Sequence, residues 1–182
     1  MTVFTVGHGA RDIESFVALL RAAGVELLVD VRTAPGSRKH PQFGRDALRT
    51  SLGEAGIDYV WEGHDLGGWR RPRADSRHNT LRSDGFRGYA DHMDTEGFRR
   101  ARRRVLEAAA GRRTAVMCAE SLWWRCHRRL LADALVAAGA EVRHIMDGPR
   151  LEQHRLPAHA RIEGDLPVYD VAGDDSGQRR IV

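Results

Sequence analysis

Short apolar segments alternate along this chain with stretches of helical periodicity, and this order restricts the folds open to it. The apolar segments predict buried strands at 2–6, 26–31, 57–61, 114–118 and 141–146. The helical patterns between them lie around 13–23, 45–55, 86–93, 96–110 and 124–138. Alternating βα units predict an α/β fold, a three-layer sandwich around a mostly parallel sheet of about five strands, with helices on both faces.

The length of 182 residues is that of one domain with its own core. We expect a single domain over 1–182, with a βα core at 1–148 and an irregular C-terminal extension at 149–182 packed on it. The extension allows a short strand pair around 160–169. The stretch at 63–83 has little periodicity, and a loop of this length inside a domain is usually functional or mobile.

The charge balance allows two interpretations. The net charge is +4, and because Lys39 is the only lysine, 28 of the 29 basic residues are arginine. A basic chain suggests nucleic-acid binding, but GC-rich coding produces the same arginine bias without a ligand. The densest group lies in one predicted helix, on the side expected to face solvent: Arg99, Arg100, Arg102, Arg103 and Arg104. A solvated face is the favoured interpretation and a nucleic-acid footprint the alternative.

Apolar runs and cysteines bear on location. No segment approaches the roughly 20 apolar residues of a membrane span, and the N-terminus resembles a strand rather than a signal peptide. The two cysteines are compatible with a reducing compartment. We therefore expect a cytoplasmic protein without membrane contact.

The segment from Cys118 to Arg128 concentrates the reactive side chains of the chain, where a predicted strand gives way to a helix. In an open α/β sheet, ligands bind beyond the carboxyl ends of the strands. Other predicted strands end there too, so we expect a convergence of the side chains that follow them: His8, Arg32, Cys118 and Glu120. Asp30, which closes the second strand with Arg32, is expected to form a structural ion pair with Arg32 in preference to a role in the site.

Cys118 is the candidate nucleophile. The dipole of the following helix, with Arg125 and Arg128 in its first turns, would stabilise a thiolate there. In this interpretation His8 or His127 is the acid/base, Glu120 an orienting carboxylate, and Arg32 with Arg128 an anion clamp. A buried structural thiol is the equally weighted alternative.

Cys126 and His127 are adjacent, and on a helix adjacent side chains point about 100° apart. This geometry predicts that the two cannot both face one ligand. Suitable metal donors are present, but the spacing from Cys118 to Cys126-His127 matches no recognised zinc motif. The sequence therefore implies no cofactor firmly and leaves a metal open.

Two further groups are candidates for substrate binding. Ser37 and Arg38 lie in a basic loop near Arg32 and extend the predicted anion-binding rim; the alternative is a mobile loop. Tyr89 is expected to be a core residue whose hydroxyl is hydrogen-bonded, with a site role second. Trp123 and Trp124 are expected to pack at the edge of the domain, or to form an aromatic wall for a flat ligand.

Several motifs together resemble one family. They are Thr5-Val-Gly-His8, Asp30-Val-Arg32, Pro41-Gln-Phe43, Leu66-Gly-Gly68, Gly88-Tyr-Ala-Asp-His-Met93, Cys118-Ala-Glu120, Cys126-His-Arg128 and Leu151-Glu-Gln-His-Arg-Leu156. The chain is similar to the DUF488 family of small bacterial and archaeal proteins of uncharacterised function. The resemblance implies functional roles for nine residues: His8, Asp30, Arg32, Ser37, Cys118, Glu120, Cys126, His127 and Arg128. The turn between Glu120 and Cys126 lacks a proline that is common in the family.

Three hypotheses follow from the sequence. The first is an enzyme with a Cys/His/Arg cleft that acts by hydrolysis or group transfer on a phosphorylated or nucleotide-like, anionic substrate. The second is a nucleic-acid-binding module without chemistry, and the third is a metal-binding protein that uses the same cysteines and histidines. The substrate and the oligomeric state do not follow from the sequence.

Overall fold

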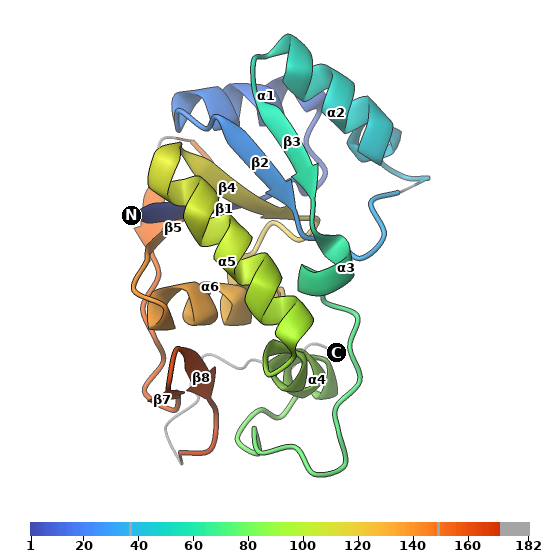
Figure 1. The fold of residues 1–182 in the computed structure, drawn as a ribbon. Coiled ribbons are helices and arrows are strands. Elements are labelled where there is room, and N and C mark those ends of the chain that lie inside the picture. The colour runs from blue at the N-terminus through green and yellow to red at the C-terminus, as the bar shows by residue number, and fades with distance from the viewer. Residues whose placement is uncertain (37, 149, 172–182) are drawn as a thin grey trace.

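The computed structural model describes residues 1–36, 38–148 and 150–171, and it shows the predicted α/β architecture (Figure 1). The strands of the main sheet are β1 (Thr2–Gly7), β2 (Leu27–Asp30), β3 (Asp58–Trp61), β4 (Thr114–Cys118), β5 (Glu141–Ile145) and β6 (Leu151–Gln153). Their order across the sheet is β3-β2-β4-β1-β5-β6, and β1 to β5 run parallel. The parallel sheet of about five strands is thus confirmed, with one antiparallel strand added.

The helices form the two outer layers. They are α1 (Ile13–Ala22), α2 (Arg45–Glu54), the single-turn α3 (Gly63–Leu66), α4 (Asp84–Met93), α5 (Glu96–Gly111) and α6 (Arg128–Ala137). Short 3-10 turns lie at Pro41–Phe43 and Trp123–Arg125. One core cluster joins α1 and α2 to the sheet, and a second joins α4, α5 and α6 to it. Helices therefore cover both faces, as predicted. None of the described helices is long and apolar enough to cross a membrane.

The extension after 148 is more regular than expected. Strand β6 pairs antiparallel with β5, so the extension adds an edge strand to the main sheet. The strand pair allowed around 160–169 is present as β7 (Arg161–Glu163) and β8 (Leu166–Val168). These segments are too short to show a period in the sequence, and their pairing partners decide their structure.

One arginine of the predicted solvent-facing group is buried. The Arg102 side chain is only 5% exposed on α5 and pairs with Asp165, which precedes β8. Its guanidinium also donates to the backbone oxygen of Asp165 at 2.5 Å. The expectation that all five arginines face solvent was wrong for Arg102, because the sequence does not reveal that the C-terminal hairpin covers this side of α5.

A Cys-Cys-His cluster and an adjacent pocket

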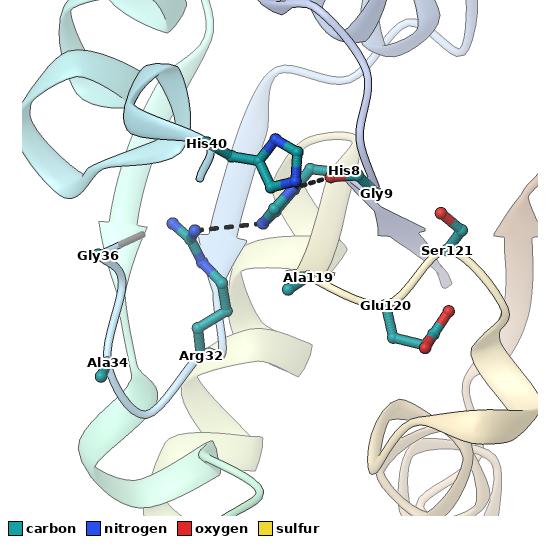
Figure 2. A pocket seen from close by; sticks show the side chains of 9 residues that line it. All are labelled: His8, Gly9, Arg32, Ala34, Gly36, His40, Ala119, Glu120 and Ser121. Atoms are coloured by element: carbon teal, nitrogen blue, oxygen red, sulfur yellow. Dashed lines mark hydrogen bonds between the residues drawn. The ribbon is translucent and has the colours of Figure 1, made fainter. Parts of the chain in front are cut away.

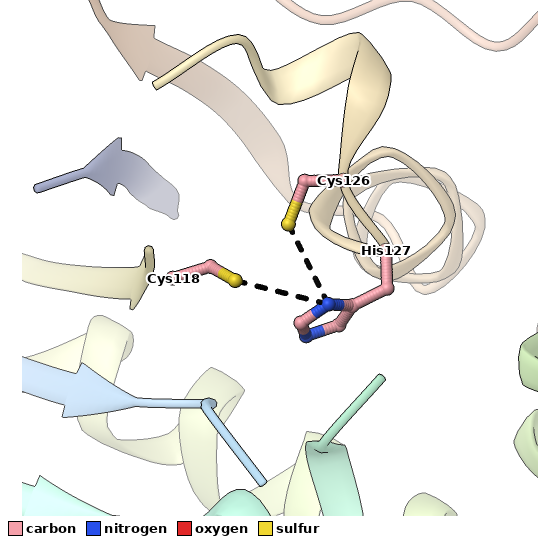
Figure 3. Close-up of side chains that lie close together, drawn as sticks. All are labelled: Cys118, Cys126 and His127. Carbon is pink, nitrogen blue, oxygen red and sulfur yellow. Dashed lines mark hydrogen bonds between the residues drawn. The ribbon is translucent and has the colours of Figure 1, made fainter. Parts of the chain in front are cut away.

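Cys118, Cys126 and His127 form one cluster at the carboxyl edge of the sheet (Figure 3). Cys118 ends β4, whereas Cys126 and His127 immediately precede α6. Nδ1 of His127 lies 3.5 Å from the Cys126 sulfur and 3.9 Å from the Cys118 sulfur. All three donor atoms lie within 4.8 Å of one another. The arrangement brings two thiols and an imidazole to one point.

The prediction that Cys126 and His127 are turned apart was wrong. It assumed a helix from 124 to 138, but the helix α6 begins at Arg128. Cys126 has extended backbone angles, φ −119° and ψ 155°, and follows a 3-10 turn. Because the 100° rotation applies only within a helix, the two side chains are free to converge.

The predicted convergence of strand ends holds only in part, because neighbouring residues of a strand point to opposite faces of the sheet. Cys118 pairs in register with Gly7, so its side chain shares the face of Gly7 and not that of His8. It packs in the core beneath α4, α5 and α6, whereas Phe43, which stacks on His8, belongs to the core beneath α1 and α2. His8, Arg32 and Glu120 do line one pocket, but in the described part of the chain Cys118 is not among its lining residues.

This pocket has a volume of about 450 Å³, and Figure 2 shows the side chains that line it. Its remaining lining residues are Gly9, Ala34, Gly36, His40, Ala119 and Ser121. Ala119 directly follows Cys118, and the charge of Cys118 acts on Arg32. Pocket and cluster are therefore neighbours at the same edge of the sheet.

His8 is held as a neutral imidazole. Its Nδ1 donates to the backbone oxygen of Gly9 at 2.8 Å, so Nε2 is left to accept from Arg32 at 3.3 Å. The ring stacks on Phe43 with centroids 4.1 Å apart. Burial is the largest influence and lowers the pKa of His8 to about 4. A role as acid/base would require a substrate to displace Arg32 from Nε2.

Arg32 and Asp30 form a buried ion pair. The guanidinium donates from Nε at 2.9 Å and from a terminal nitrogen at 2.5 Å to the two carboxylate oxygens. Tyr59 donates to the same carboxylate at 2.8 Å. Burial opposes the charge on Arg32, but the hydrogen bonds to Asp30 outweigh it and raise the pKa of Arg32. Asp30 thus engages two of the three guanidinium nitrogens, which supports the structural ion pair expected for Asp30.

The other predicted substrate-binding residues lie in different settings. Arg128 is buried and donates to Thr5 Oγ1 at 3.3 Å and to the backbone oxygen of Glu120. Tyr89 is buried, donates to the Leu66 oxygen at 3.1 Å, and places its ring 5.0 Å from that of His127.

Arg38 and Arg125 are exposed, and Ser37 lies outside the described residues. The Glu120 side chain accepts from the backbone of Leu122 at 3.1 Å and so shapes its own loop. Of the adjacent tryptophans, Trp123 stacks on His144 with centroids 4.1 Å apart, and Trp124 is partly exposed.

The two thiols of the cluster influence each other. Burial raises the pKa of Cys126, but the hydrogen bond from Cys118 and the contact with His127 outweigh it and hold that pKa well below its usual range. The hydrogen bond with Cys126 is the largest influence on Cys118 and, with burial, raises its pKa well above the usual range. The thiolate predicted for Cys118 is thus better stabilised at Cys126.

Sequence reasoning missed residues that hold this cluster in place. Gly68 packs against His127, and its signal was the motif Leu66-Gly-Gly68, to which no role had been assigned. Thr5 accepts a hydrogen bond from Arg128, and the sign of it in the sequence was a hydroxyl between the apolar residues Phe4 and Val6.

Fold and site together define an open α/β protein with a Cys-Cys-His cluster at the carboxyl edge of its parallel sheet. The chain belongs to the DUF488 family: the family model, described as a domain of unknown function, matches residues 12–135. The match ends within α6, so β5 to β8 lie beyond it. No curated protein and no solved structure matches the chain.

Proposed function

We propose that this protein is a metal-dependent enzyme, acting by hydrolysis or group transfer, in which Cys118, Cys126 and His127 hold a zinc ion. The observation that carries the proposal is the convergence of two sulfur atoms and one imidazole nitrogen from two separate segments on one point. Thiolate and imidazole are the ligands that zinc prefers in proteins.

The distances between donors support this assignment. Tetrahedral zinc, with Zn–S of about 2.3 Å and Zn–N of about 2.0–2.1 Å, separates a sulfur and a nitrogen ligand by roughly 3.5 Å. The Cys126 sulfur lies 3.5 Å from His127 Nδ1, and the Cys118 sulfur lies 3.9 Å from it. A shift of a few tenths of an ångström would bring the second pair into the same geometry.

The number of ligands favours a reactive centre over a structural one. The described residues provide three donors, whereas structural zinc sites take four and catalytic sites take three and keep one position open. Zinc in such a site lowers the pKa of a coordinated water to about 7. The neighbouring pocket, lined by His8, Arg32 and Glu120, is where we propose that an anionic or nucleotide-like substrate binds.

Two other hypotheses remain predictions. A cysteine nucleophile would use the same cluster without a metal, through one thiolate beside His127. Nucleic-acid binding through α5 receives less support, because Arg99 pairs with Asp165 and Arg104 with Glu62.

Zinc content and zinc affinity test the proposal. Protein purified without added metal is analysed for bound elements, and the apoprotein is titrated with zinc against a chromophoric chelator. We expect one zinc per chain, and we expect Cys118→Ser, Cys126→Ser and His127→Ala each to weaken binding by more than the roughly 10- to 100-fold effect of losing an outer partner. His64→Ala is the control, since the His64 side chain is 86% exposed and outside the cluster.

The outcomes separate the hypotheses. Stoichiometric zinc that depends on all three residues supports the metal centre. Absence of zinc binding, with fast alkylation of one cysteine in the apoprotein, would contradict it and favour a thiol enzyme. A screen of phosphate esters and nucleotides with zinc-loaded and zinc-free protein then tests turnover, which should require the metal.

A further inference from the structure

A continuous chain of buried polar side chains runs from the cysteine loop into the C-terminal extension. Its members come from five elements or loops and are each 5% exposed or less: Thr5, Arg128, Asp133, His144, His154 and Tyr169. Buried polar groups cost free energy unless they are hydrogen-bonded, so a chain of this length indicates a requirement beyond packing.

The hydrogen bonds of this chain have one consistent direction. Arg128 donates to Thr5 Oγ1 at 3.3 Å, which leaves the hydroxyl proton of Thr5 for Nδ1 of His144 at 2.7 Å. His144 then carries its proton on Nε2 and donates to Nδ1 of His154 at 3.0 Å.

This series of hydrogen bonds ends at the carboxylate of Asp133. His154 donates from Nε2 to Asp133 at 2.7 Å, and Tyr169 donates to the other oxygen of Asp133 at 2.7 Å. Burial, the largest influence on His144, lowers its pKa to about 2, in agreement with a neutral ring. From Thr5 to Asp133 each donor thus has one acceptor, and removing one member leaves a donor or an acceptor of its neighbours unpaired.

Arg128 connects this series of hydrogen bonds to the loop between Cys118 and Cys126. Its guanidinium also donates to the backbone oxygens of Glu120 and Ser121, which follow Cys118 by two and three residues. Arg128 itself follows Cys126 by two residues. One side chain therefore ties together both ends of the loop that carries the cluster.

We propose that Thr5, His144, His154 and Tyr169 are positioning residues, through which the C-terminal extension fixes Arg128 and hence the separation of Cys118 from Cys126 and His127. The inference rests on the proposed function where metal affinity is the readout. His144, His154 and Tyr169 lie beyond the matched residues 12–135. The extension would then be a working part of the site and not only a cover for α6.

The test replaces Thr5, because valine keeps its shape and removes only the hydroxyl. Thr5→Val removes the partner of one terminal nitrogen of Arg128 and of Nδ1 of His144, whereas Thr5→Ser keeps the hydroxyl and is the conservative control. A second control is Leu166→Ala, which shortens a buried side chain of β8 without touching the polar chain. Each variant is first checked for the wild-type fold by circular dichroism.

Two readouts are measured on each variant. The first is the zinc dissociation constant, with the cobalt(II) absorption spectrum as a report of ligand geometry. The second is the rate of iodoacetamide labelling of the cysteines in metal-free, native protein, which requires no metal site. We expect Thr5→Val to weaken zinc binding about 10- to 100-fold and to change the cobalt spectrum. Labelling should become at least about tenfold faster, because the loop opens more often.

Thr5→Ser should behave like the wild type in both readouts, and Leu166→Ala should lower stability and leave zinc affinity and the cobalt spectrum unchanged. Wild-type labelling and zinc affinity in Thr5→Val would overturn the inference while the metal proposal stands. If the wild-type protein binds no zinc, the metal proposal fails, and the labelling rates alone then decide the inference.

Discussion

The backbone of Gly68 lies directly against the imidazole of His127. A Cβ added at Gly68 would come within 2.4 Å of Nδ1, the atom that faces both cysteine sulfurs, and within 2.7 Å of Cγ. This contact explains the second glycine of Leu66-Gly-Gly68. The loop after α3 thereby fixes the position of the ring.

Gly68→Ala is therefore expected to displace His127 and to weaken zinc binding at least about tenfold, since loss of an outer partner costs 10- to 100-fold. The control is Gly53→Ala in α2, where an added Cβ meets nothing within 4 Å. That variant should keep zinc affinity and gain about 0.5–1 kcal/mol of stability. Equal zinc affinity in both variants would show that the Gly68 contact does not position the ring.

The ion pair of Asp30 and Arg32 should be a major contributor to stability. Asp30→Asn leaves the Arg32 guanidinium buried without its counter-charge, and we expect a loss of about 3–5 kcal/mol in the free energy of unfolding. Tyr59→Phe, which removes one hydrogen bond to the carboxylate, should cost about 1–2 kcal/mol. Asp75→Asn, with an 89% exposed side chain, is the control and should change little in urea unfolding. A small effect of Asp30→Asn would show that the pair is not structural.

Acid should destabilise the protein through His8 and His144. In the unfolded chain both imidazoles bind protons near pH 6.5, whereas the folded pKa values are about 4 and about 2. The unfolded state binds more protons between these limits, so stability falls as the pH drops below about 6.5. Below about pH 6.5, each histidine lowers the free energy of unfolding by about 1.4 kcal/mol for each unit by which the pH falls. Below about pH 4, only His144 continues to lower it.

Urea unfolding of the wild type and of His144→Gln between pH 7 and pH 5 measures this dependence. The variant lacks one titrating group, so its stability should depend on pH less steeply by about one proton. Parallel curves for the two proteins would mean that His144 does not resist protonation in the folded state.

Arg102 should contribute to the free energy of unfolding, whereas its neighbour Arg103 should not. Arg102→Ala removes the charge-assisted hydrogen bonds to Asp165, and we expect a loss of about 2 kcal/mol in thermal or urea unfolding. Arg103→Ala is the matched control one residue along α5, where the side chain is 62% exposed. It should stay within about 0.5 kcal/mol of the wild type. The same small loss for both would place Arg102 at the surface in solution.

The fold followed from the sequence wherever a local pattern carried the information. Continuous apolar strands and amphipathic helices predicted the parallel sheet and its two helical layers, since both signals are periodic. Strands of three residues, such as β6 and β7, have too few positions for a period, and their pairing depends on distant partners. The burial of Arg102 likewise depends on a segment that is distant in the sequence, the C-terminal hairpin.

The sequence predicted which residues lie at the site better than it predicted how their side chains are arranged. Because parallel strands end at the same edge of a sheet, the sequence predicted that His8, Arg32 and Glu120 lie close together, and they line one pocket. The opposite orientations of His8 and Cys118 required the register between β1 and β4, which a single sequence does not supply. The joint site of Cys126 and His127 was missed because the start of α6 was predicted four residues early, and helix ends are less well defined by periodicity than helix centres.

X-ray absorption at the zinc edge of the purified, metal-loaded protein tests the central claim most directly, because it reports the atoms bound to the metal. We predict two sulfur ligands at about 2.3 Å, one imidazole nitrogen at about 2.0–2.1 Å and one further light atom. In Cys126→Ser, one of the two sulfur contributions should disappear. A spectrum without sulfur ligands, or one unchanged in Cys126→Ser, would contradict a metal centre at Cys118, Cys126 and His127.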